Sequence, residues 1–258
     1  IVFHYNGIEL KKIFNLKNCR NLLHVDIART PNGTLYFGEY GANNNRGTVP
    51  IYRSKDNGKT WDIVYLFGEN TIKHIHCVKY DPFSNKVWVF TGDKDGECKI
   101  MIAEEDFSSH RFIGDGTQKF RSCNVFFLED KVVWMMDSPN EISYCVHFDR
   151  ANESISLNFA FNGPVWYSHE LNNGKFVCAT SVEPGYSMQN KTAQVLLSDD
   201  LLNWKVAVEF KKDFWPVRLF KNGVVAFPIG MQDENKVLMF GEALNKFDGV
   251  VKEFDLKM

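Results

Sequence analysis

The sequence has little net charge, no long apolar run and none of the common nucleotide-binding motifs. No apolar segment approaches the roughly 18 residues that a membrane-spanning helix needs. The formal net charge is only −2, so no broad basic face is implied and nucleic acid is not expected as a partner. A P-loop, a G-x-G-x-x-G after a strand and a G-x-S-x-G are all missing from the sequence.

The chain also lacks a C-x-x-C spacing and shows no secretion signal. There are six cysteines without a C-x-x-C spacing, and most lie in apolar strand-like runs, so we expect buried free thiols. The even count leaves disulfides open, and with them the compartment, although the cytoplasm is favoured. No basic segment followed by an apolar core stands at the start. The beginning at Ile1 suggests a domain of a longer chain.

Aromatic residues and tight-turn residues, by contrast, are plentiful. Aromatics make up 14% of the chain, including 22 Phe, and aromatic side chains favour strands. Short apolar runs alternate with turns such as Pro31-Asn-Gly33 and Asn172-Asn-Gly174. No segment shows a long helical period, so we expect an all-β protein.

A weak internal repeat narrows the fold class. The unit is a strand, a turn, a second apolar strand that usually ends in an acid, and a looser hairpin. Its copies start 44 to 50 residues apart, at His24, His74, Arg121, Val165 and Trp215. A four-stranded propeller blade takes about 40–50 residues. The repeat therefore predicts one β-propeller domain over residues 1–258, with about five four-stranded blades.

Residues 1–23 precede the first copy and include a strand-like stretch. We expect them to complete the last blade, so that strands from the two termini close the ring and remove free sheet edges. A sixth, incomplete blade is the structural alternative.

One motif resembles a known signature. From Ser54 the chain reads SKDNGKTW, which resembles the Asp box, or BNR repeat, of sialidase-like β-propellers. A degenerate copy, SDDLLNW, covers 198–204, and 103–107 is a further eroded candidate. The resemblance implies a turn between the two outer strands of a blade, on the face away from the active site. It makes Asp56 and Asp200 structural residues.

A second similarity lies closer to function. In sialidases the partner of the first inner strand reads like G-T-L-x-x-F-x-E, and residues 33–39 (GTLYFGE) resemble it, with one residue fewer between Leu35 and Phe37. The Arg-Ile-Pro expected before it is replaced by His24-Val-Asp26. That Arg would hold the carboxylate of sialic acid. Its absence, and five blades instead of six, argue against a true sialidase.

Blade geometry predicts where polar residues meet. The start of a blade's first strand and the end of its second lie on one rim, so polar residues at these places converge on the channel mouth. In His74-Ile-His76 the two imidazoles share a face because strand side chains alternate. Paired carboxylates can cleave a glycosidic bond. The catalytic candidates are His24, Asp26, Glu39, His74, His76, Asp93, Asp137 and Glu183.

Further side chains near this mouth could bind a sugar. Aromatic rings stack on sugar faces, and arginines bind the carboxylate of an acidic sugar. The substrate-binding candidates are Arg46, Glu97, Arg121, Trp166, Tyr186, Trp215 and Arg218. Alternatively, His24, His74 and His76 with a carboxylate could hold a divalent metal, an arrangement that resembles some propeller-type polysaccharide lyases.

The contributions of the five blades differ from one another, which favours one central site over a repeated lectin site. We therefore expect a carbohydrate-active enzyme, a hydrolase or a lyase, whose glycan is acidic in the preferred interpretation. Two alternatives remain. Polar side chains can line a wet channel without a function, as an Arg121–Asp137 pair would. The chain could also be a non-catalytic propeller that binds a glycan or a protein.

Overall fold

The computed structural model describes residues 2–16, 27–230, 232 and 236–255. Within these ranges the chain is built from strands, with one short 3-10 helix, η1 (Gln118–Phe120). The prediction of an all-β protein with almost no helix is confirmed. In the described part, no helix has the length and apolar character needed to cross a membrane. The chain divides into two compact units, residues 1–121 and 122–258.

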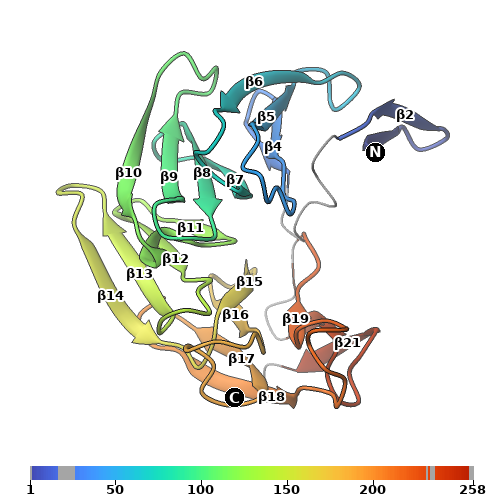
Figure 1. Cartoon of the computed structure of the whole chain (residues 1–258), viewed down its shortest axis with the longest axis vertical. Coiled ribbons are helices and arrows are strands. Elements are labelled where there is room, and N and C mark those ends of the chain that lie inside the picture. The colour runs from blue at the N-terminus through green and yellow to red at the C-terminus, as the bar shows by residue number, and fades with distance from the viewer. Residues whose placement is uncertain (1, 17–26, 231, 233–235, 256–258) are drawn as a thin grey trace. The chain divides into compact units, whose positions relative to one another are not determined.

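The first unit contains a hairpin and two four-stranded antiparallel sheets (Figure 1). The hairpin is β1 (Val2–Tyr5) and β2 (Leu10–Phe14). The first sheet is β3 (Ala28–Arg29), β4 (Leu35–Gly38), β5 (Val49–Ser54) and β6 (Asp62–Phe67). The second is β7 (His74–Asp81), β8 (Lys86–Gly92), β9 (Cys98–Ala103) and β10 (His110–Gly116). In each sheet the strands pair in chain order, as expected of a propeller blade.

The second unit repeats this meander. One sheet is β11 (Val125–Phe127), β12 (Lys131–Met135), β13 (Tyr144–Asp149) and β14 (Ile155–Ala160). The next is β15 (Val165–Glu170), β16 (Phe176–Thr180), β17 (Thr192–Ser198) and β18 (Lys205–Lys211). The last has three strands in the described residues, β19 (Val224–Ala226), β20 (Lys236–Glu242) and β21 (Val250–Asp255).

Apolar side chains of neighbouring sheets form the cores. In the first unit, Ile51, Ile75 and Val89 are almost completely buried in one cluster. Gly38 is needed where β4 meets β7, because a Cβ atom there would lie 2.5 Å from the Ile75 side chain. The Ile75 amide donates to the Glu39 carbonyl oxygen at 2.9 Å, which fixes the end of β4 beside the start of β7. This junction places the site described below.

The described residues form six sheets where the sequence predicted five blades. The difference lies at the N-terminus. The strands β1 and β2 pair with each other as a separate sheet instead of extending the sheet of β19–β21. The ring of Phe14 then packs on the first sheet, with its centroid 5.0 Å from that of Tyr52 and 6.5 Å from that of Phe37. Burial of this aromatic ring explains why the hairpin stays beside its own unit.

The last sheet also differs from the repeat. The sequence predicts an inner strand from Trp215, but the first strand there is β19, which begins at Val224. Pro216 explains this, because proline has no amide hydrogen to give to a strand ladder. Its carbonyl oxygen instead accepts the amides of Leu219 and Phe220, both at 3.0 Å, which closes a turn.

Ser54–Trp61 forms the turn between β5 and β6, the two outer strands of the first sheet. The Ser54 hydroxyl accepts the Gly58 amide at 2.8 Å, and the Asp56 carboxylate accepts the Thr60 amide at 2.8 Å. Ser54 pairs with Leu35 at the start of β4, so the turn lies at the opposite end of the sheet from Glu39. A similar turn, one residue shorter, occupies residues 198–204 between β17 and β18: Ser198 accepts the Leu201 amide and Asp200 accepts the Asn203 amide, both at 2.8 Å.

Candidate functional site

The candidate site begins at the start of β7, where the strand carries a β-bulge. The pairing with β8 passes from Ile75 directly to Cys77, so His76 is an extra residue on β7. In a regular strand, residues two apart lie about 6–7 Å from each other. A bulge re-aims side chains. Here the Nε2 atoms of His74 and His76 lie 2.8 Å apart.

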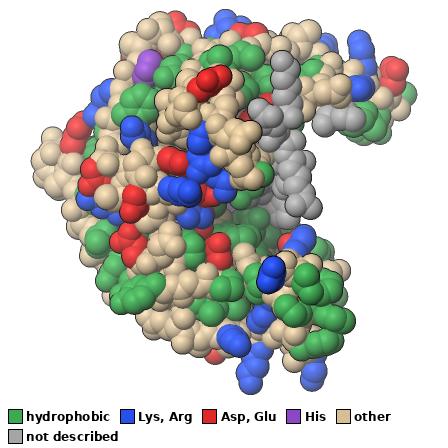
Figure 2. Space-filling view, viewed as in Figure 1, with side chains coloured by type: hydrophobic (Ala, Val, Ile, Leu, Met, Phe, Trp, Pro, Cys, Tyr) green, Lys and Arg blue, Asp and Glu red, His purple; other side chains and the backbone are tan. Residues whose placement is uncertain are grey.

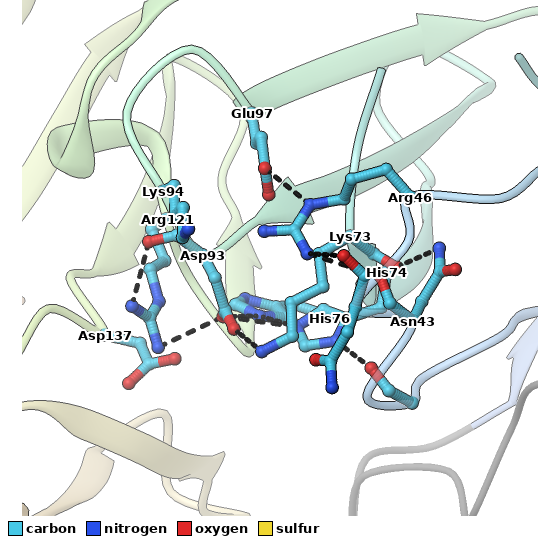
Figure 3. A network of polar contacts seen from close by, with 12 residues as sticks. Asn43, Arg46, Lys73, His74, His76, Asp93, Lys94, Glu97, Arg121 and Asp137 are labelled. Atoms are coloured by element: carbon cyan, nitrogen blue, oxygen red, sulfur yellow. Dashed lines mark hydrogen bonds and ion pairs between the residues drawn. The ribbon is translucent and has the colours of Figure 1, made fainter. Parts of the chain in front are cut away.

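The carboxylate of Asp93, just after β8, joins the two imidazoles (Figure 3). Its Oδ1 atom lies 3.2 Å from the Nε2 atom of His74 and 3.2 Å from that of His76. The same oxygen lies 3.3 Å from Arg121 Nη2. The other oxygen, Oδ2, accepts a hydrogen bond from Lys73 Nζ. Asp93 is thus the common partner of four basic side chains.

These contacts keep Asp93 ionised. Burial alone would raise the pKa of its carboxyl group. Hydrogen bonds from His74 and His76, and the positive charges of His76 and Arg121, outweigh burial and hold the pKa well below its usual range. Asp93 is therefore an anion at neutral pH.

The loop after β4 orients His74. The His74 Nδ1 atom lies 2.7 Å from the carbonyl oxygen of Gly41. Because a carbonyl oxygen only accepts, Nδ1 carries the proton in this bond, which orients Nε2 toward His76 and Asp93. The Tyr40 ring packs against His74 with centroids 4.2 Å apart. Asn43 holds the loop in place by donating to the Lys73 carbonyl oxygen at 2.8 Å.

The helical turn η1 fixes the other side of the site. Gln118 Nε2 donates to the Asp93 carbonyl oxygen at 3.0 Å and to Asp95 Oδ1 at 3.1 Å. Arg121 follows η1, and its Nη1 also donates to the Asp93 carbonyl oxygen, at 3.2 Å. Both side chains therefore hold the backbone from which the Asp93 carboxylate projects.

An ion pair borders the cluster. Arg46 Nε lies 2.7 Å from Glu97 Oε1, and both residues are labelled beside the histidines in Figure 3. The backbone φ angle of Arg46 is +51°, a left-handed conformation that is uncommon for residues other than glycine. Such positions cost free energy and often occur at functional sites.

Several predicted residues therefore meet in the first unit. The structure brings together His74, His76, Asp93 and Arg121 by direct contacts, and pairs Arg46 with Glu97. Glu39 is buried, and its carboxylate accepts the Tyr52 hydroxyl at 2.8 Å. His24 and Asp26 lie outside the described residues. The convergence of all five repeats on one rim stays a prediction.

The remaining candidates belong to the second unit. Asp137 is buried, and its Oδ2 lies 3.3 Å from Cys123 Sγ. Glu183 follows β16 and is half-buried. Trp166 is the extra residue of a bulge in β15 and packs against the apolar core. The side chains of Tyr186 and Arg218 are exposed.

Trp215 lies in the turn before β19 and is 47% exposed. Its ring packs on Phe214 and Phe220, with centroids 4.5 and 4.8 Å away. It lines a pocket of about 570 Å³, together with Phe240 and Glu242. The pocket thus combines an aromatic wall with a carboxylate.

Sequence reasoning missed four residues of the cluster: Lys73, Tyr40, Asn43 and Gln118. Lys73 directly precedes His74, and its cationic side chain beside two histidines was an available signal. The other three lie in loops or in η1, and only the folded chain brings them to the strand ends.

Charged groups of opposite sign are interspersed around the site. On the face shown in Figure 2, Lys and Arg side chains alternate with Asp and Glu. Within the cluster, the cations of Lys73, Arg121 and Arg46 each lie against a carboxylate. A ligand at the site would therefore meet positive and negative groups side by side.

Comparisons with known proteins identify the fold. No family model and no curated protein matches the sequence. The chain is similar to a protein in a nidogen/laminin complex, with a TM-score of 0.54 and 10% identity, over 89% of this chain and 74% of that one. A protein described as TolB from Agrobacterium tumefaciens has a TM-score of 0.53 and 14% identity, over 78% of this chain and 70% of its own. TolB from Acinetobacter baumannii has a TM-score of 0.53 and 12% identity, over 96% of this chain and 59% of its own. At these identities the similarity shows the fold alone, and the fold is a β-propeller.

Proposed function

We propose that the chain is a carbohydrate-active enzyme that acts on an acidic glycan at the cluster of His74, His76 and Asp93. One observation carries this proposal: two imidazoles in mutual contact lie beside Lys73 and Arg121. An imidazole can exchange protons near neutral pH, and the cations can hold a carboxylate. The proposal includes a single pocket at the mouth of the propeller channel.

Elimination fits the cluster better than hydrolysis does. A glycoside hydrolase needs one carboxylic acid that is protonated, with a raised pKa. Asp93 is unsuited to this role because its neighbours lower its pKa. In an elimination, a base removes the proton next to the uronate carboxylate, and that electron pair becomes the new C=C bond. The bond to the leaving oxygen breaks, and this oxygen takes up a proton.

The two imidazoles could share this work. One Nε2 atom accepts the proton of the substrate, and the other returns a proton to the leaving oxygen. Their separation of 2.8 Å allows a proton to pass between them. Lys73 and Arg121 would neutralise the substrate carboxylate, which makes the neighbouring proton easier to remove.

A non-catalytic propeller that binds a glycan or a protein is the second candidate. The observation in its favour is burial: the side chains of His74 and His76 are only 3% and 1% exposed. A substrate would have to displace part of the surrounding loops to reach them. The more exposed side chains of Lys73 and Asp93, at 24% and 19%, would suffice for binding alone.

The test is an activity screen of the purified chain with polyuronates such as alginate and polygalacturonate, and with neutral glucans as a comparison. Elimination produces an unsaturated sugar that absorbs in the ultraviolet, whereas hydrolysis produces reducing ends without this absorbance. We expect absorbance with a polyuronate and loss of turnover of about 100-fold or more in His76→Asn. His110→Asn is the matched control, because His110 is exposed on β10.

Absence of turnover with every charged glycan, in protein that is folded by circular dichroism, would contradict the enzyme proposal. Retained binding of the glycan in that protein would then support the second candidate. Equal turnover in His76→Asn and His110→Asn would place the chemistry elsewhere in the chain.

A further inference from the structure

We propose that His74, His76 and Asp93 bind one divalent transition-metal ion through two imidazole nitrogens and one carboxylate oxygen. The proposal rests on the same side chains as the proposed function, and it assigns that site a cofactor. Each residue offers one ligand atom, and the three atoms lie within 4.8 Å of one another.

The three ligand atoms form a triangle of the right size. Its sides are 2.8 Å between the two Nε2 atoms and 3.2 Å from each of these to Asp93 Oδ1. A point in the plane at equal distance from all three would be about 1.8 Å from each, which is shorter than metal–nitrogen bonds of about 2.0–2.1 Å. An ion therefore reaches all three atoms from a position about 1 Å out of the plane. All three ligands then occupy one face of the ion, and its opposite face stays open, as in sites with two histidines and one carboxylate.

Neighbouring groups orient two of the three ligand side chains. A histidine that binds a metal through Nε2 usually donates its Nδ1 hydrogen to a carbonyl or carboxylate. His74 makes this bond to the Gly41 carbonyl oxygen at 2.7 Å. The Oδ2 atom of Asp93 accepts a hydrogen bond from Lys73, which leaves Oδ1 directed at the imidazoles. The carboxylate is thus oriented as a ligand that binds through one oxygen.

The charge and the type of the ligand atoms determine which ions can bind. Two neutral imidazoles and one carboxylate carry a single negative charge, and nitrogen ligands favour Zn²⁺, Co²⁺ or Ni²⁺ over Mg²⁺ and Ca²⁺. Lys73 and Arg121 oppose the ion electrostatically, and the Arg121 contact to Oδ1 at 3.3 Å must lengthen when the ion binds. We therefore expect moderate affinity for the ion.

A bound ion would change one part of the proposed function. The imidazoles would serve as ligands instead of proton carriers, so a hydroxide on the ion would have to accept the substrate proton, and the carboxylate of the acidic glycan would bind beside it at the open face of the ion. A metal ion stabilises negative charge on such a carboxylate without any proton transfer. The substrate class stays the same.

The experiment uses the full chain without a histidine tag, treated with a chelator and dialysed. Zn²⁺ or Co²⁺ is titrated by calorimetry, and bound Co²⁺ is also followed by its visible absorption. We expect one ion per chain and a higher melting temperature with the ion. His76→Gln and Asp93→Asn should each weaken binding by about 100-fold, while His110→Gln should bind like the wild type.

The proposal is overturned if no ion binds at millimolar concentration, or if His76→Gln binds as tightly as His110→Gln. The two proposals fail separately. Turnover of a polyuronate by the chelated protein would support the glycan enzyme and overturn the metal as its cofactor. An ion bound by all three residues, without turnover of any glycan, would support the metal site and contradict the proposed enzyme.

Discussion

Removal of the Asp93 charge should destabilise the fold strongly, because this carboxylate is the common anion of the site. In Asp93→Asn, Lys73 and Arg121 lose the anion that they share, and their side chains are only 24% and 10% exposed. Removal of one partner from a buried ion pair costs about 3–5 kcal/mol. Asparagine keeps an acceptor oxygen, and Lys73 has some access to water. We therefore expect the free energy of unfolding to fall by an amount near the lower end of this range, about 3 kcal/mol at pH 7.

The effect should depend on pH in a defined direction. The pKa of Asp93 is lower in the folded state than in the unfolded state, where it is about 3.9. The stabilisation is therefore fully present above about pH 4 and is lost as the pH falls below this value. Urea unfolding at pH 7, and at several pH values down to pH 3, measures the stability of the wild type and of Asp93→Asn. Both proteins are first treated with a chelator to remove metal ions. The difference between wild type and Asp93→Asn should shrink at the acidic end.

Asp62→Asn provides the matched control. Asp62 pairs with Arg53 at 2.7 Å in the same unit, but its side chain is 55% exposed. An exposed pair of this kind is worth less than about 1 kcal/mol. If Asp93→Asn is no less stable than Asp62→Asn at pH 7, Asp93 is not the anion on which the cluster depends, and the electrostatic reasoning is refuted.

Two further predictions concern other parts of the chain. Ser54→Ala should lower the free energy of unfolding in urea by about 1–2 kcal/mol, because it leaves the buried amide of Gly58 without its acceptor; an unchanged value would mean that water replaces the hydroxyl. Burial lowers the pKa of His147, so the melting temperature should fall as the pH drops below about 6.5. His147→Gln should reduce this fall, and an equal fall in both proteins would contradict the assignment.

The sheets could be predicted from the sequence because each strand shows a local pattern. His74 and Val165 begin β7 and β15 at the repeat starts, where apolar runs follow turn residues. The last sheet shows the limit of this reasoning. The run from Trp215 has the composition of a strand, but Pro216 turns the chain there, and β19 begins only at Val224.

The hairpin of residues 2–14 shows a second limit. Its strand pattern is local, whereas its place depends on Phe14 packing against Tyr52, a contact between residues far apart in the sequence.

The site was predictable in its residue types and only partly in its geometry. Alternation in β7 indicated that His74 and His76 share a face, and the repeat indicated that Asp93 lies near them. The bulge that brings the two Nε2 atoms to 2.8 Å leaves no signal in the sequence. The role of η1 was also hidden, because a single helical turn is too short to produce a period.

The bulge in β7 has a counterpart in β15. Together the two bulges indicate how the sequences of the repeated sheets can come to differ. The extra residue is His76 in one strand and Trp166 in the other, each near the start of the first strand of its sheet. Because the extra residue stands between two register pairs, a change of its side chain leaves the following pairs, such as Val78 with Val89, in place. The same backbone can thus acquire an imidazole in one copy and an indole in another. Duplicated sheets built in this way can gain new chemistry one position at a time without losing their cores.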